Sequence, residues 1–98
     1  MATLPEGMDP AFAAQYRKIQ QTFIAGLPQR MHDIRHAPDA EARHVALHRL
    51  AGAAGGYGFS ELSTLAREAM DAGPGADELQ HIAIERLAQV IEVTCRSS

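Results

Sequence analysis

The chain has 98 residues, of which 46% are hydrophobic and 21% are charged. That size suits one domain, whose folding buries roughly 60–65% of the surface of the unfolded chain. The net charge is -3 and the basic residues are scattered, so no patch attracts a nucleic-acid backbone. We therefore predict a single domain over residues 1–98 with no nucleic acid among its partners.

Other function classes are disfavoured by what the sequence lacks. Its apolar runs are far shorter than the roughly 20 residues that cross a bilayer, and its start has no basic segment followed by an apolar one. Cys95 is the single cysteine, so neither an internal disulfide nor a cysteine zinc cluster is available. No glycine-rich nucleotide loop is present. We expect a cytoplasmic protein that does not contact a membrane and has neither an ATP site nor a metal site. We also expect that it is not an independent kinase or hydrolase.

The first third of the chain predicts two consecutive helices. Asp9-Pro10 is typical of a helix start, and the apolar residues that follow recur every three or four positions to residue 27. This stripe consists of Phe12, Tyr16, Ile19, Phe23 and Leu27. Because proline interrupts a helix, we expect a kink or break at Leu27-Pro28 and a second short helix over 28–37.

Three further helices follow. Pro38-Asp39 restarts the chain, and Gly55-Gly56 should end the third helix. A fourth helix over 59–72 should end at Gly73-Pro74-Gly75, and the last should cover about 77–95. The apolar faces of these three are Ala40, Leu47, Leu50, Ala51 and Ala54; Leu62, Leu65, Ala66, Ala69 and Met70; and Leu79, Ile82, Ala83, Leu87, Val90 and Ile91.

No segment alternates as a half-buried strand does, and the predicted connections are short. Apolar stripes one helix face wide pack against one another when neighbouring helices run antiparallel. The fold class that we predict is all-α: an up-and-down antiparallel four-helix bundle with an additional short or kinked N-terminal helix.

One histidine lies where chemistry is possible. At 100° per residue, His48 falls on the flank of the third helix beside the buried Leu47, where we expect partial exposure. The same flank carries His44, Gly52 and Gly55. Glycine inside a helix costs roughly 0.5–1 kcal/mol relative to alanine, so Gly52 calls for an explanation. A flat surface beside a reactive imidazole, open to another protein's active site, provides one.

The segment HRLAGAAGGYGFSELSTLAREA resembles the histidine phosphotransfer (HPt) family. The family motif is a histidine, a leucine or isoleucine two residues later, usually a lysine or arginine, then a glycine, with a second glycine and a leucine-spaced helix after it. The matching residues are His48, Leu50, Gly52, Gly58, Leu62 and Leu65. The upstream segment FIAGLPQRMHDIRHAPDAEARHVALHRL is similar to the family's approach to its histidine.

The resemblance implies that His48 accepts a phosphoryl group from a receiver-domain aspartate and passes it to another response regulator. Implied partners are receiver domains of response regulators and of a hybrid histidine kinase, of which this chain could itself be a part. The receiver supplies Mg²⁺ and a lysine, so no cofactor of its own and no enzymatic activity are expected. Partner-binding positions are Gly52, Gly55, Gly56 and Gly58.

This chain departs from the family pattern at one position. Ala51 stands where the family usually has a lysine or arginine. Arg49 and His44 are possible substitutes near the phosphate, although Arg49 lies about 100° around the helix from His48. If position 51 lies at the rim of the core, a lysine there should be tolerated, because its stem can lie along apolar surface.

Two rival functions remain open. The pairs His32/His36 and His44/His48 have the four-residue spacing that can place two imidazoles on one metal ion or haem in a helical bundle. Alternatively, the domain binds receivers as an adaptor without accepting phosphate, which the alanine at position 51 allows. Bound metal and acid-labile phosphate on His48 distinguish the three functions.

Overall fold

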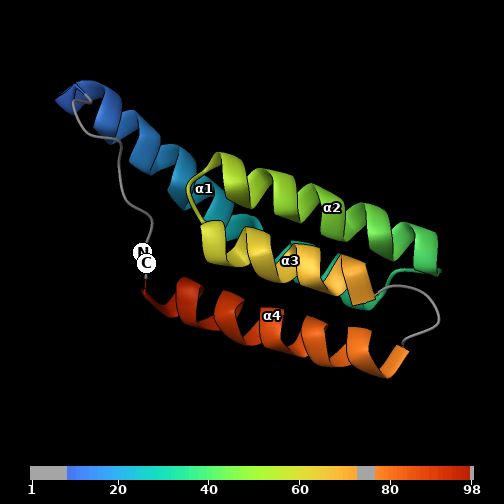
Figure 1. The fold of residues 1–98 in the computed structure, drawn as a ribbon. Helices are drawn as coiled ribbons and strands as arrows, with labels where there is room; N and C mark the ends of the chain where they lie inside the picture. The colour runs from blue at the N-terminus through green and yellow to red at the C-terminus, as the bar shows by residue number, and fades with distance from the viewer. Residues whose placement is uncertain (1–8, 73–76, 98) are drawn as a thin grey trace.

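The computed structural model describes residues 9–72 and 77–97, and these form four helices without a strand. The helices are α1 (Pro10–Arg35), α2 (Ala40–Gly56), α3 (Ser60–Ala72) and α4 (Asp77–Ser97). They pack side by side as a bundle 47 Å long, with α3 between α2 and α4 (Figure 1). The predicted four-helix bundle is therefore confirmed. No described helix is long and apolar enough to cross a membrane. The predicted stop at Gly73-Pro74-Gly75 lies outside the described residues.

The first helix is continuous, so the predicted break at Leu27-Pro28 and the separate helix over 28–37 are wrong. It begins where expected, with the Asp9 carboxylate accepting a hydrogen bond of 2.9 Å from the backbone N–H of Ala11. Pro28 lies inside the helix, although it cannot donate to the carbonyl of Ile24 four residues earlier.

Two features favour continuity of α1 through the proline. The Sγ of Cys95 in α4 lies 3.8 Å from the Ile24 oxygen and donates to it in place of the missing N–H. Leu27 and Met31, on either side of Pro28, are both buried. Burial of one apolar face on both sides of position 28 therefore outweighs the local cost of proline.

The core follows the predicted stripes except at four large residues. Phe12 is exposed in the first turn of α1, and the start of this helix extends beyond the end of α2 (Figure 1). Ile19 is exposed although its neighbour Gln20 is buried, so it lies on the outer face of α1. Leu79 and Ile82 are exposed because the inner face of α4 is turned toward other residues, including Ile84, which the predicted stripe omitted. Ala40, at the first position of α2, is also exposed. The buried apolar residues are Phe23, Ile24, Leu27, Met31, Ile34, Leu47, Leu50, Ala51, Ala54, Leu62, Ala66, Ala69, Ile84, Leu87 and Ile91.

At one end of the bundle, a polar network joins all four helices. Arg43 of α2 donates through Nε to the carbonyl of Ile34 in α1 (3.3 Å) and through Nη1 to Oε1 of Gln80 in α4 (3.5 Å). Buried Gln80 donates in turn to the carbonyl of Ala69 in α3 (3.1 Å). The Ile34 carbonyl needs a side-chain donor because Pro38, four residues later, has no N–H.

At the other end, α1 holds the turn between α2 and α3. The buried Gln20 amide donates to the carbonyl of Tyr57 at 2.8 Å. The Phe23 ring packs between those of Tyr57 and Phe59, with centroid distances of 5.2 and 5.3 Å. Gly58 has a φ of 86°, a conformation in which a Cβ is disfavoured. These contacts set the positions of α2 and α3 relative to each other.

Candidate functional site

The helix that carries His48 is fixed at its start and along its inner face. The Asp39 carboxylate accepts a hydrogen bond of 2.8 Å from the backbone N–H of Ala42, which is the arrangement of an N-cap. Leu47 and Leu50 are fully buried, while His48 between them is exposed. The prediction placed His48 at the edge of the core, and the structure places it there with its side chain open to solvent.

Small residues bring α2 and α3 close together along what we call the α2–α3 seam, defined by Ala51 and Gly55 on α2 and Ser63 on α3. The buried Ser63 hydroxyl donates to the carbonyl of Ala51 at 2.9 Å. A Cβ built on Gly55 would lie 3.4 Å from the Ser63 Oγ. Gly55 therefore allows the close approach of the two helices.

The outer flank of α2 is open beside His48. His44 and Gly52, one turn to either side, are exposed. A Cβ added at Gly52 or at Gly56 would meet no atom within 4 Å. Gly52 is thus not explained by helix packing, and its strip of α2 is accessible to an approaching molecule. The structure brings together His44, His48, Gly52 and Gly55, as predicted, and places Gly56 at the end of the helix.

Position 51 does not lie at the rim of the core. Ala51 is 3% exposed and belongs to the core. A lysine at this position would have to bury its stem among the helices, so the rim position that would allow a lysine is not observed. Arg49 is exposed but follows His48 by one residue, which places it about 100° around α2. Neither position 51 nor the α2 flank that carries His48 therefore has a lysine or an arginine.

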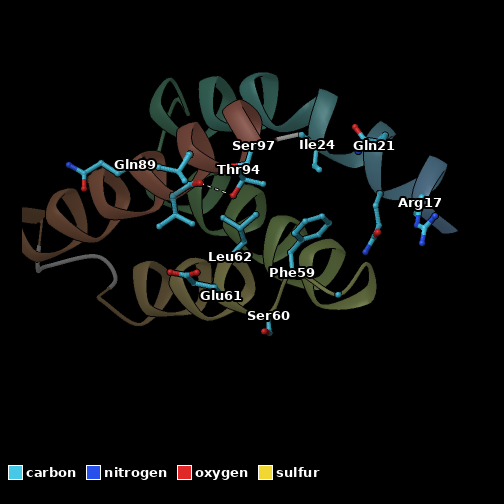
Figure 2. Close-up of a pocket in the computed structure, with 14 residues that line it drawn as sticks. Arg17, Gln21, Ile24, Phe59, Ser60, Glu61, Leu62, Gln89, Thr94 and Ser97 are labelled. Carbon is cyan, nitrogen blue, oxygen red and sulfur yellow. Dashed lines mark hydrogen bonds between the residues drawn. The ribbon is translucent and has the colours of Figure 1, made fainter. Parts of the chain in front are cut away.

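A large hollow in the described part of the chain lies away from His48. It is an open groove of about 960 Å³ between α1, the start of α3 and the end of α4 (Figure 2). Ile24, Phe59, Leu62 and Val93 contribute apolar surface, with Arg17 and Glu61 among its polar residues. Of the predicted site residues, Gly58 alone lines it. The structure accounts for Gly58 through its backbone conformation, and separates it from His48.

The two histidine pairs differ in geometry. The rings of His32 and His36 on α1 have centroids 4.3 Å apart. Around neither pair do the described residues provide three or more histidine, cysteine, aspartate or glutamate side chains that could hold a metal ion. No specific observation therefore favours a metal-binding function over the site on α2.

No family model matches the chain, and no curated protein or solved structure is similar to it at a significant level. The chemical capacity of the site therefore follows from its geometry. An exposed imidazole stands on a rigid helix, with a side-chain-free strip on one side and the α2–α3 seam on the other. Such an imidazole can act as a nucleophile toward a group delivered by another molecule.

Proposed function

We propose that this protein is a histidine phosphotransfer protein of a cytoplasmic phosphorelay, with His48 as the phosphoacceptor. The observation that carries the proposal is the exposed His48 on α2 of a four-helix bundle, beside an open position at Gly52. The resemblance of the surrounding segment to the HPt motif supports it. The buried Ser63 hydroxyl donates to the Ala51 carbonyl and lies beside Gly55, which holds α3 against the helix that presents the imidazole.

The chemistry requires little of this chain beyond presentation. The Nε2 lone pair of neutral His48 attacks the phosphorus of a receiver's aspartyl phosphate as an N–P bond forms. The P–O bond to the aspartate breaks, and its electron pair remains on the carboxylate. In the second transfer, the same steps run toward another receiver's aspartate. In-line positioning comes from the docked surfaces, and the receiver's Mg²⁺ and lysine neutralise charge.

The receiver docks, in this proposal, over the flank formed by His48, Gly52 and Gly55 and over the adjoining face of α3. A relay partner must leave after each transfer, so we expect a small transient interface of about 1,200 Å² or less. The lack of a side chain at Gly52 lets the receiver's active site approach the ring.

The test replaces the nucleophile without disturbing the core. His48→Gln should keep the far-UV spectrum and the unfolding midpoint of the wild type, because position 48 is exposed. It should lose acid-labile phosphate uptake from phosphorylated receivers of the source organism. His81→Gln, at an exposed position of α4 rather than of the helix that carries His48, is the matched control and should keep uptake.

The outcomes separate the candidate functions. Uptake that persists in His48→Gln contradicts the assignment of the phosphoacceptor. Wild-type protein that binds a receiver yet never takes up phosphate is an adaptor, and this result contradicts the relay function.

A further inference from the structure

The contacts at the α2–α3 seam fix which residues face each other across it. Ser63 of α3 donates to the Ala51 carbonyl of α2 and lies opposite Gly55, and the two helices, joined by three residues, run antiparallel (Figure 1). Arg67 follows Ser63 by four residues, about 6 Å along α3. His48 precedes Ala51 by three residues, about 4.5 Å along α2. In an antiparallel pair these two displacements point in the same direction. Arg67 and His48 therefore lie at nearly the same height along the bundle axis.

Both side chains also lie on the seam side of their helices. His48 and Gly55 are seven residues apart, which separates their directions by only about 20° around α2. Arg67 and Ser63 are four residues apart, which separates theirs by about 40° around α3. Because Gly55 and Ser63 meet across the seam, while His48 and Arg67 are exposed, the latter two line its solvent edge.

The charge of Arg67 is available to a ligand. Arg67 forms no ion pair or side-chain hydrogen bond with any other residue in the described part of the chain, whereas Arg35 pairs with Glu85 at 3.1 Å. The acidic residues nearest to it in α3 are Glu68, on a neighbouring face, and Asp71, one turn later. Neither forms an ion pair with Arg67.

We propose that Arg67 and His48 form a phosphoryl-binding pair across the α2–α3 seam, in which the Arg67 guanidinium contacts the phosphoryl group carried by His48. This inference rests on the proposed function. A planar guanidinium can donate two parallel N–H bonds to phosphoryl oxygens, and its long stem spans neighbouring helices. The cation that is missing from position 51 of α2 is then supplied by α3.

The pair can be tested without any receiver. Phosphoramidate is a small donor in which a protonated nitrogen is bonded to phosphorus. The Nε2 lone pair of His48 attacks phosphorus, the N–P bond of the donor breaks, and ammonia leaves with the electron pair. His48→Gln identifies which phosphorus-31 resonance belongs to residue 48. Failure of receivers to phosphorylate the chain would contradict the proposed function, but this measurement would still test the pair.

Arg67→Gln and Arg49→Gln are the variants to compare, because each removes one exposed arginine near His48. A nearby cation favours the phosphoryl dianion, so its removal raises the pKa of the phosphoryl group. In Arg67→Gln we expect this pKa, read from the phosphorus-31 shift, to rise by about half a pH unit, equivalent to about threefold in affinity for the proton. Arg49→Gln should leave it unchanged, and Arg67→Lys should keep most of the effect.

Three results would overturn the inference. One is an unchanged phosphoryl pKa in Arg67→Gln, and another is an equal rise in both glutamine variants. The third is labelling of other histidines by phosphoramidate while His48 stays unlabelled, since an arginine beside the ring should draw the anionic donor to it.

Discussion

Gly52 and Gly55 of α2 illustrate how two residues of one type have different roles on one helix. Space for a side chain is open at Gly52, whereas Gly55 faces the Ser63 hydroxyl across the seam. A helix interior disfavours glycine at both positions by a similar amount. The structure therefore places position 55 against α3 and position 52 on the open surface of α2.

Comparing Gly52→Leu with Gly55→Leu tests this difference. Gly52→Leu should leave the free energy of unfolding unchanged or raise it by up to about 1 kcal/mol, because leucine is the better helix former. It should nevertheless weaken receiver binding and phosphotransfer strongly. Gly55→Leu should lower the free energy of unfolding by about 1–3 kcal/mol through overpacking against Ser63. Urea unfolding and a receiver-binding titration give both quantities. If Gly52→Leu loses stability and binding to the same degree, Gly52 serves packing instead.

Much of the site, but not all of it, was predictable at the scale of residues. The 100° helical angle places His48 beside buried Leu47, and that prediction needs the sequence alone. The apolar stripe includes Ala51, but whether that position lies at the rim or deep in the core was not predictable, because this depends on how closely α3 approaches α2. No sequence pattern indicates Arg67 as a site residue, since its height along the bundle relative to His48 follows from the position of Ser63, a residue on another helix than His48. The small residues on both sides of the Tyr57–Phe59 turn do indicate that α2 and α3 approach each other closely.

Among the elements, α1 departs most from its prediction, because Pro28 lies inside a continuous helix. Local propensity disfavours a mid-helix proline by about 3 kcal/mol. That cost is offset by buried side chains on both sides and by the Cys95 thiol, which lies 3.8 Å from the Ile24 oxygen. Burial raises the pKa of the Cys95 thiol, which helps to keep its proton available for donation. Neither effect is visible in the local sequence.

A double-mutant cycle measures the link between Pro28 and Cys95. Pro28→Ala should raise the free energy of unfolding by about 1–2 kcal/mol, because it supplies an N–H for the Ile24 carbonyl. Cys95→Ala should destabilise the wild type, and should cost about 0.5 kcal/mol less in the Pro28→Ala background, where the carbonyl already has a donor. Chemical unfolding of the four proteins provides the test. An equal cost of Cys95→Ala in both backgrounds would show that the thiol does not serve this carbonyl.

In the whole molecule, two polar anchors stand at opposite ends of an apolar core. Gln20 holds the α2–α3 turn at one end, and at the other Arg43 and Gln80 connect α1, α2, α3 and α4. Apolar stripes predict that helices pack, but they do not specify register along the bundle axis. Directional hydrogen bonds to particular carbonyls, such as those of Ile34 and Ala69, do specify it.

Gln80 is the member of the network whose removal should matter most. Gln80→Ala removes the Ala69 carbonyl's donor and one acceptor of the Arg43 guanidinium. We expect a loss of about 2 kcal/mol in the free energy of unfolding, because the partners are buried or partly buried. Gln89→Ala, at an exposed position of the same helix, should change it by less than about 0.5 kcal/mol. Similar small effects of both substitutions in thermal unfolding would contradict the anchoring role of Gln80.

The three-residue Tyr57–Phe59 connection between α2 and α3 has a consequence for how the molecule assembles. Closing such a short loop costs little conformational entropy, and topologies dominated by such local contacts fold fast. The pairing of α1 with α4, by contrast, joins opposite ends of the described chain, as the Ile24 and Cys95 contact shows. The hairpin that carries His48 therefore closes over a short loop, whereas the packing of α1 against α4 requires the closure of most of the described chain.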